Sequence, residues 1–427
     1  MRVTILAIGS EGDVRPLAAL GEGLARASHD VRLASPRTFR DIALALGLDF
    51  APVDIDPFEI VRSALGQAWL ASMDRPARFL AEVSRLAREV LSALNRDAWE
   101  ACRGSEALIY NLPLSVSGYT IAESLGIPGI PAALYPLHPT RAFPSVLTPG
   151  LPLRGRAANM LSGLSVVQAF WMMFRYHQKR SWIPKPALPG IPVRNPMAAW
   201  RKSGVPLLYG YSPSFVPPPP DWPDTAAVCG YWFSPPREWE PARELVDFLE
   251  AGPVPVYVGF GSMAGADPEG TTRTVLGALR LTGQRAILAS GWGGLLHGSL
   301  PEGVLPVSSV PHEWLFPRIS IAVHHGGAGT TAAALRAGTP SVVVPFFADQ
   351  FFWGGRLHAL GLGPRPIPKK ELSSETLAEA IRFALGAPGV RERCASMAES
   401  IRAENGVDTA AAVADRYLRS TTSRMRR

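Results

Sequence analysis

The chain has 427 residues, a length that predicts two to three domains of about 100–200 residues each. Apolar residues make up 47% and the net charge is a mild +7, which excludes a disordered chain and, without any nucleic-acid module pattern, a nucleic-acid partner. Its 3 cysteines are too few and too far apart for a disulfide framework or a zinc cluster.

The first half predicts strands that alternate with helices. Arg2–Ile8 is a continuous apolar run, typical of a strand buried on both faces. A glycine-rich turn follows at 9–13, and Val14–Ala27 then repeats apolar residues at helical spacing. Long amphipathic helices are expected within Arg62–Ala101. Further strands are predicted at Val31–Ala34, Phe50–Val53, Ala107–Leu112, Gly129–Ala133 and Pro206–Tyr211.

A proline-rich segment, Ser212–Pro223 (SPSFVPPPPDWP), predicts a stiff linker, because prolines cannot lie inside a helix or a central strand. Strand and helix patterns restart beyond it. We therefore expect two doubly wound, Rossmann-like α/β domains that face each other across a cleft, at 1–212 and 224–405 with a linker at 213–223. The last part, at 406–427, is expected to be a C-terminal helix with a basic tail. One arrangement open to this helix is to pack against the first domain.

No membrane span or signal peptide is expected from the sequence. The N-terminal apolar run is too short for a signal peptide, and the best internal run, Val166–Phe174, is interrupted by Gln168. The expected location is the cytoplasm, with at most peripheral membrane contact. Leu161–Arg180 combines apolar and basic residues, which fits either a bilayer surface or the wall of an acceptor pocket, and we favour the pocket.

The second half contains a glycine-rich turn with several hydrogen-bond donors, His324–Thr331 (HHGGAGTT), between a predicted strand and a predicted helix. Glycines expose backbone N–H groups, and a helix N-terminus attracts negative charge. His325, Thr330 and Thr331 add donors, so the segment predicts a site for a phosphate or pyrophosphate. The alternative is an ordinary strand–helix turn in which Thr330 caps the helix.

Two other turns follow strands in this half. Gly259–Gly265 lacks the acidic residue that a dinucleotide site needs at the end of the next strand, which argues against NAD, although Ser262 could donate to a phosphate. Asp349 and Gln350 offer acceptors and an amide donor that suit sugar hydroxyls. The alternative is that Asp349 caps the next helix.

Asp13, in the first turn, fits either a general base or the cap of the following helix. His138 is a second candidate for the base, or a plain loop residue. Asp54 and Asp56 imitate a metal-binding Asp-x-Asp pair, but their place after the third strand argues against a metal site. We expect no metal and no cofactor.

These motifs together resemble those of glycosyltransferases with the GT-B fold, in particular sterol glucosyltransferases and bacterial enzymes that glycosylate polyketide and glycopeptide antibiotics. The resemblance rests on three segments: GSEGDVRP at 9–16, HHGGAGTT at 324–331 and PFFADQFFW at 345–353. Their order and spacing also fit, so the resemblance spans nearly the whole chain. It is weakest over residues 55–105 and 140–200, where such enzymes recognise acceptors.

The resemblance implies a role for each of these sites. Asp13 would deprotonate the acceptor hydroxyl, and Asp349 with Gln350 would bind the sugar. The backbone of Val310 would meet the nucleotide base. The pyrophosphate would be held by Ser262, His325, Gly326, Gly327, Gly329 and Thr330. Apart from the resemblance, we expect Ser10, His138, Trp171 and Phe174 to bind the acceptor.

The resemblance further implies an inverting, metal-independent transfer of a hexose to a hydroxyl of a hydrophobic acceptor such as a sterol, a polyketide or another natural product. UDP-glucose is the favoured donor. A dTDP-sugar stays open, because the uracil-stacking Trp and ribose-binding Glu of the plant relatives are Ser309 and Ala333 here. The alternatives are a lipid-linked cell-wall sugar transferase at a membrane face and a silent nucleotide-sugar or lipid-binding protein. We expect a monomer or weak dimer.

Overall fold

The computed structural model describes residues 1–70, 72, 76–111, 115–147, 155–181, 192, 194–235, 239–261, 267–289 and 300–425. They form two compact units, one of Met1–Pro235 with Glu404–Arg427 and one of Pro236–Ala403. Ser262 lies outside the described residues, so its predicted role has no structural counterpart here.

The first unit is built on a seven-stranded sheet of order β3-β2-β1-β4-β5-β6-β7, in which all neighbouring strands are parallel. Its strands are β1 (Arg2–Leu6), β2 (Asp30–Pro36), β3 (Asp49–Val53), β4 (Ala107–Asn111), β5 (Gly129–Ala133), β6 (Leu207–Tyr209) and β7 (Ala226–Val228). Its helices are α1 (Glu11–Arg26), η1 (Arg37–Phe39), α2 (Arg40–Leu44), α3 (Pro57–Arg62), α4 (Ala64–Leu70), α5 (Pro76–Cys102), α6 (Ser115–Leu125), α7 (Arg156–Gln178), α8 (Met197–Ser203) and α16 (Gly406–Met425).

The second unit holds a five-stranded parallel sheet of order β10-β9-β8-β11-β12. Its strands are β8 (Val256–Gly259), β9 (Ala286–Ala289), β10 (Val304–Val307), β11 (Ala322–His324) and β12 (Ser341–Val343). Its helices are α9 (Arg243–Glu250), α10 (Pro268–Thr282), α11 (His312–Leu315), η4 (Phe316–Arg318), α12 (Ala328–Ala337), α13 (Asp349–Ala359), η5 (Lys369–Glu371), α14 (Ser374–Gly386) and α15 (Val390–Ala403).

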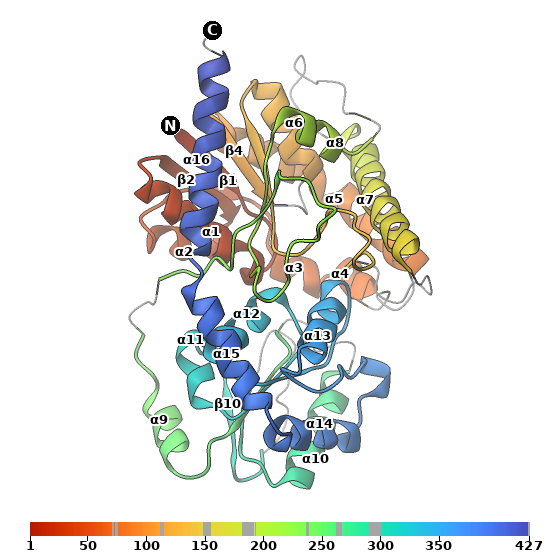
Figure 1. Cartoon of the computed structure of the whole chain (residues 1–427), viewed down its shortest axis with the longest axis vertical. Helices are drawn as coiled ribbons and strands as arrows, with labels where there is room; N and C mark the ends of the chain where they lie inside the picture. The colour runs from red at the N-terminus through yellow and green to blue at the C-terminus, as the bar shows by residue number, and fades with distance from the viewer. Residues whose placement is uncertain are drawn as a thin grey trace. The chain divides into compact units, whose positions relative to one another are not determined.

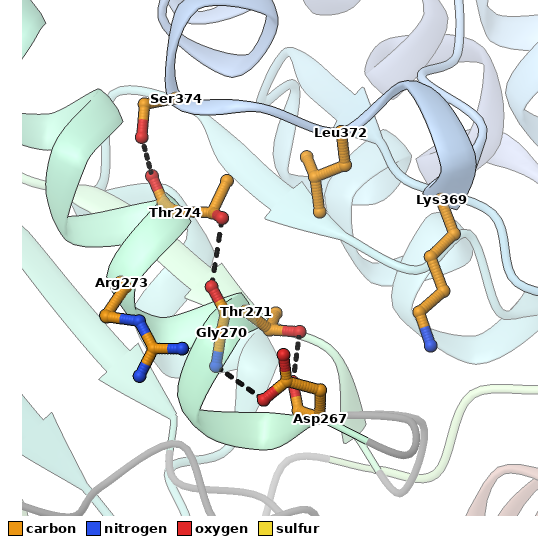
Figure 2. A pocket seen from close by; sticks show the side chains of 8 residues that line it. All are labelled: Asp267, Gly270, Thr271, Arg273, Thr274, Lys369, Leu372 and Ser374. Carbon is orange, nitrogen blue, oxygen red and sulfur yellow. Dashed lines mark hydrogen bonds between the residues drawn. The ribbon is translucent and has the colours of Figure 1, made fainter.

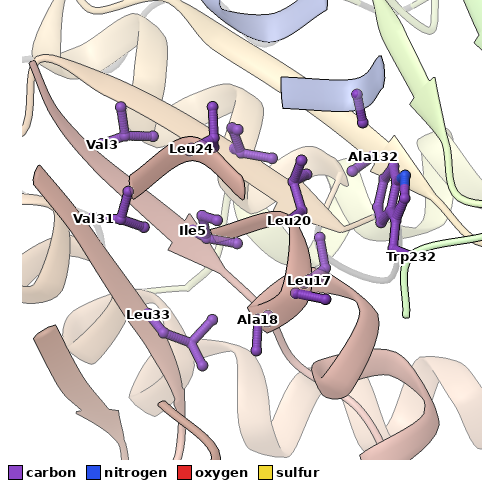
Figure 3. Packing of buried hydrophobic residues seen from close by; sticks show 14 of the residues in the cluster. Val3, Ile5, Leu17, Ala18, Leu20, Leu24, Val31, Leu33, Ala132 and Trp232 are labelled. Carbon is purple, nitrogen blue, oxygen red and sulfur yellow. The ribbon is translucent and has the colours of Figure 1, made fainter. Parts of the chain in front are cut away.

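The core of the first unit lies between β1 and its flanking helices. Ile5 on β1 and Leu17 and Leu20 on α1 are almost fully buried and share one cluster with Trp232 (Figure 3). The burial follows from the apolar strand and the helical spacing of leucines on α1, since both faces of a parallel sheet are covered in such folds. These expected strands and helices are confirmed.

The boundary between the units differs from the predicted linker at 213–223. The chain continues beyond the prolines into β7, which pairs with β6 through Tyr209 and Val228. The predicted second domain at 224–405 therefore begins too early, because the proline run connects two strands of one sheet. Strand β7 has only three residues (Ala226–Val228), too few to give a sequence signal.

The C-terminal helix α16 belongs to the first unit and lies along α1 (Figure 1). Gly23 on α1 leaves room for Val407, and Arg26 forms an ion pair with Asp408 at 2.7 Å. His29 bonds Asp415 at 2.9 Å on the same interface. Helix α16 begins at Gly406, where a Cβ would be 2.6 Å from the carbonyl carbon of Gly230.

A side chain at position 406 would overlap the backbone of Gly230 and Tyr231. The substitution Gly406→Ala should therefore destabilise the protein by about 1–3 kcal/mol, the usual cost of overpacking. The measurement is the free energy of unfolding in urea. Gly386→Ala is the control, because no atom lies within 4 Å of a Cβ there. An equal effect of the two substitutions would contradict the packing described for α16.

Candidate functional site

In each unit a glycine-rich turn that carries predicted site residues lies where the strand order reverses. Ser10 and Asp13 follow β1, and Asn111 ends its neighbour β4. In the second unit Gly261 follows β8, and His325 follows its neighbour β11. Parallel α/β sheets bind ligands at such switch points, outside the carboxyl ends of the strands.

The turn after β1 places a carboxylate over a glycine. Asp13 Oδ2 accepts hydrogen bonds from Ser10 N–H at 2.8 Å and from Ser10 Oγ–H at 2.9 Å. A Cβ on Gly9, whose φ is +140°, would lie 2.7 Å from Asp13 Cγ. Only glycine therefore leaves space for this carboxyl group.

The capping alternative for Asp13 needs a correction. Helix α1 begins at Glu11 with Ser10 as its N-cap, so Asp13 is the third residue of the helix and bonds back to the cap. Burial raises the pKa of Asp13, and the hydrogen bonds from Ser10 lower it in part. Asp13 Oδ2 makes both of these bonds, and a carboxylate has a second oxygen with which to accept a proton.

Asn111 was missed by the sequence analysis. Its Oδ1 accepts from Ile8 N–H at 3.3 Å and its Nδ2 donates to Ile8 O at 2.6 Å. The side chain is 5% exposed and ties the end of β4 to the turn that carries Asp13. No local pattern indicates this role, because the two residues are 103 positions apart.

The turn after β11 uses the same arrangement with a histidine. A Cβ on Gly327 would overlap His325 Nε2, and a Cβ on Gly261 would lie 3.3 Å from His325 Cε1. Gly326 has φ +85° and faces Val343 Cγ1, so it too excludes a side chain. The imidazole of His325 thus packs against Gly261, which follows β8, and against Gly327, which follows the neighbouring strand β11.

Helix α12 begins in this turn with Gly327 as its N-cap, which has no side chain to cap the helix. The predicted alternative, Thr330 as the cap, is wrong, because Thr330 is already inside the helix. The first N–H groups of an α-helix have no partner within the helix. Near them, the buried atoms His325 Nδ1 and Thr331 Oγ1 have no hydrogen-bond partner among the described residues. These groups can bind an anion.

The two histidines of this turn are neutral. Burial, with a smaller contribution from His312, lowers the pKa of His325 to about 4. Burial also lowers the pKa of His324 well below its usual range. His324 Nδ1 accepts a hydrogen bond from Gly326 N–H at 3.1 Å, which fixes the glycine turn from within the sheet.

Asp349 and Gln350 begin helix α13 beside this turn. The N-cap is Ala348, at the strained φ of +48°, so the capping alternative for Asp349 is wrong. Asp349 Oδ2 accepts from Trp353 Nε1 at 2.8 Å. Gln350 Oε1 accepts from Phe346 N–H at 2.7 Å and Phe347 N–H at 3.2 Å. These hydrogen bonds fix both side chains at the start of α13.

Other predicted residues lie apart from these turns. Val310 precedes α11 and packs at the edge of an apolar cluster of the second unit. Asp54 accepts from Arg37 at 3.4 Å and its N–H donates to Asp97. Within the described ranges, no three histidine, cysteine or acidic side chains are placed to hold a metal ion.

Helix α7 divides its aromatic residues between two faces. Trp171 is 4% exposed, lies 5.7 Å from Tyr119 in ring-centroid distance and packs, like Phe174, on Val116. The predicted apolar run 171–174 therefore does not form one surface, because successive helical residues point about 100° apart. The outward face carries four exposed apolar or aromatic residues, Leu161, Leu164, Met172 and Tyr176.

Among the described helices, α7 alone is long and apolar enough to cross a membrane by length and composition. The sequence expectation that the chain has no membrane span stays a prediction, because this finding rests on length and composition alone. Residues 157–174 contain no charge, but five polar or glycine positions interrupt the apolar residues. Only 22% of its most apolar window is buried in the protein.

A hollow of about 460 Å³ lies at the N-terminal ends of α10 and α14, and its described lining residues include none of the predicted site residues (Figure 2). Its polar groups largely bind one another. Asp267 accepts from Gly270 N–H at 2.8 Å, and Ser374 donates to Thr274 O at 3.0 Å. We therefore assign no ligand to it.

Two family models match this chain. Residues 3–144 match the glycosyltransferase family 28 N-terminal domain, and residues 289–414 match the C-terminal domain of erythromycin biosynthesis protein CIII-like proteins. The sterol 3-beta-glucosyltransferase of Neurospora crassa is 37% identical over 96% of this chain. That of Emericella nidulans is 36% identical over 99%. The chain spans 27% and 30% of the length of these two curated relatives.

Solved structures of similar fold include the glycosyltransferase of kitacinnamycin, with a TM-score of 0.67 and 17% identity over 98% of this chain and 99% of the other. CalG4, the calicheamicin glycosyltransferase, has a TM-score of 0.63 and 19% identity over 98% of both chains. The glycosyltransferase VinC in complex with dTDP has a TM-score of 0.62 and 18% identity, over 97% of this chain and 100% of the other. At these identities the likeness shows the fold.

The lowered pKa of His325 predicts a loss of stability in acid. In the unfolded chain His325 takes up a proton near pH 6.5, whereas in the folded protein it does so only near pH 4. Between these values unfolding binds a proton, so the free energy of unfolding falls as the pH falls. His325→Gln should reduce this slope by up to about 1.4 kcal/mol per pH unit, the value for one proton.

The measurement is urea unfolding from pH 7 to pH 4.5, with the exposed His358→Gln as the control. A slope that His325→Gln leaves unchanged would mean that the His325 imidazole is not buried and neutral.

Proposed function

We propose that this chain is a glycosyltransferase of the GT-B fold that transfers a hexose from a nucleotide sugar to a hydroxyl of a hydrophobic acceptor. The observation that carries the proposal is the glycine turn of His325 and Gly327 at the start of α12. It joins unpaired helix N–H groups to a neutral imidazole and lies inside the segment that matches an antibiotic-biosynthesis domain.

In this proposal the diphosphate of the donor binds the α12 N-terminus. The N–H groups from Gly327 to Thr330, together with His325, donate to its oxygens, and the helix dipole stabilises the charge that develops on the leaving diphosphate. Ser262 would add a donor. Asp349 and Gln350 bind the sugar hydroxyls, and the backbone of Val310 meets the base.

UDP-glucose is the donor we favour, because the relatives with the highest identity given above are sterol 3-beta-glucosyltransferases. A dTDP-sugar is the second choice, since a structure of the same fold is a dTDP complex. For the acceptor we propose a sterol, a polyketide or another hydroxylated natural product. The proposed place of the reaction is the cytoplasm.

The proposed chemistry is a single displacement that inverts the anomeric carbon. An alcohol is too weak an acid to ionise near pH 7, so a base must take its proton in the transition state. Asp13 is proposed as that base. Its raised pKa makes it a better proton acceptor than an ordinary aspartate. No metal or other cofactor has a role in this scheme.

Incubation with UDP-, dTDP- and GDP-glucose, each with and without a panel of sterols and polyketides, tests this function. We expect release of the diphosphate and a glycosylated product with one of the first two donors, at a rate that excess EDTA does not change. Binding of a nucleotide sugar without any turnover would identify a silent binding protein. Loss of activity in EDTA that Mg²⁺ or Mn²⁺ restores would contradict the metal-independent scheme.

Asp13→Asn should lower kcat by roughly 10²–10⁴, the range for a lost general base. The amide oxygen can still accept from Ser10, so the turn and the melting temperature should change little. Glu11→Gln, which removes a charge in the same helical turn, is the control and should stay within about threefold of wild type. Full activity of Asp13→Asn would exclude Asp13 as the base.

A second candidate is transfer to a lipid-linked acceptor at a membrane face. The outward face of α7 supports it. Leu161, Leu164 and Met172 lie on this face, and Lys179 and Arg180 follow at its end without any acidic residue between 156 and 180. Apolar residues beside basic ones suit the boundary of an anionic bilayer.

Flotation with phosphatidylglycerol-containing liposomes tests this second candidate. If α7 docks, the protein should float with anionic vesicles, and Leu161→Ser with Met172→Ser should lower the bound fraction at least threefold. Leu281→Ser with Phe383→Ser, which removes two exposed apolar residues of the other unit, should have no effect. Absence of flotation would contradict this second candidate and leave transfer to an acceptor that is not bound to a membrane.

A further inference from the structure

His138 lies in the loop after β5, next to the last residue of β6, Tyr209. The parallel pairing of Ala133 with Tyr209 brings the two together. The His138 and Tyr209 rings are 5.9 Å apart, and Trp222 stacks on Tyr209 at 5.1 Å. The Trp222 indole N–H also donates to His138 O at 3.1 Å. Both the backbone and the ring of His138 are therefore fixed.

The hydroxyl of Tyr209 determines which ring nitrogen of His138 carries the proton. It accepts from His138 N–H at 3.0 Å and from Leu137 N–H at 3.3 Å. These two bonds use both lone pairs of the phenol oxygen. His138 Nδ1 lies 2.8 Å from the same oxygen, so the phenol must donate its hydrogen to Nδ1. Tyr209 is fully buried, which keeps water out of this set of bonds.

A neutral imidazole that accepts at Nδ1 carries its hydrogen on Nε2. Burial lowers the pKa of His138 to about 4, so the ring stays neutral near pH 7. Nε2 takes part in none of the hydrogen bonds described for His138. A ring in this state can donate from Nε2 but has no free lone pair with which to take a proton.

His138 also lines a narrow pocket of the first unit with Leu137, Phe143 and Val146. The volume is about 10 Å³, close to what one water-sized group needs. Its other side chains are mainly apolar, so a hydrogen-bond donor here would favour a single oxygen on an otherwise hydrocarbon ligand.

We propose that His138 is an acceptor-binding residue that donates its Nε2–H to an oxygen of the acceptor, and that Tyr209 is the positioning residue that fixes this tautomer. The first part rests on the proposed function, whereas the tautomer does not. The substrate class that follows is a hydrophobe with a hydroxyl, carbonyl or ether oxygen. His138 is thereby excluded as the base, which leaves Asp13.

The tautomer is tested on the full chain labelled with ¹⁵N at histidine, by correlation of the ring nitrogens with the ring protons. We expect His138 to show the neutral Nε2–H pattern from pH 7 to pH 5. Tyr209→Phe should convert it to a mixture of the two tautomers. An Nδ1–H pattern or a charged ring at pH 7 would overturn the assignment whether or not the chain is a transferase.

Steady-state kinetics test the binding role. His138→Gln keeps a side-chain N–H donor and should stay within about tenfold of wild-type kcat/KM. His138→Leu should raise the acceptor KM about 10–100-fold. The value of kcat, and the pH at which kcat falls on the acid side of its pH profile, should not change. Equal KM values for the two variants would overturn the binding role, and a 10²–10⁴-fold loss of kcat in both would identify His138 as the base. If the wild type transfers no sugar, the proposed function fails while the tautomer is still decided by the NMR measurement.

Discussion

In each unit the position of one polar side chain depends on a glycine, because a Cβ at that glycine would overlap the side chain. Gly9 leaves the space that the Asp13 carboxylate occupies, and Gly327 leaves the space that the His325 imidazole occupies. In both turns a polar side chain lies against the backbone at the start of a helix that follows a buried strand. Any larger residue at 9 or 327 would displace the polar group, so the chemistry of both sites depends on two glycines.

The sheets decide which turns can act together. In the first unit β1 lies beside β4, and in the second β8 lies beside β11. These are the places where the strand order reverses and the helices leave the strand ends open. Asn111 bridges one pair of strand ends, and His325, which lies against Gly261, bridges the other. The two sheets thus present a fixed carboxylate and a fixed, neutral imidazole.

The sequence predicted the strand–helix alternation and both glycine turns, because their signals lie within a few residues. It missed what depends on distant contacts. Tyr209 and His138 are 71 positions apart, and no pattern within either segment joins them. The boundary at 213–223 was misplaced because a proline run can connect two strands of one sheet as well as two domains. The inward position of Trp171 on α7 likewise depends on a distant contact, with Tyr119, and its predicted role in acceptor binding stays a prediction.

If Gly327 gives His325 the position in which it binds a diphosphate, the two residues form one interaction with the ligand. Calorimetric titration of UDP and dTDP into wild type, Gly327→Ala, His325→Ala and the double variant tests it directly, with Gly386→Ala as the control. We predict that each single substitution raises the Kd of the tighter-binding nucleotide at least about tenfold and that the double variant is no weaker than either, because both remove one interaction. Unchanged binding by Gly327→Ala, or fully additive losses in the double variant, would contradict the account.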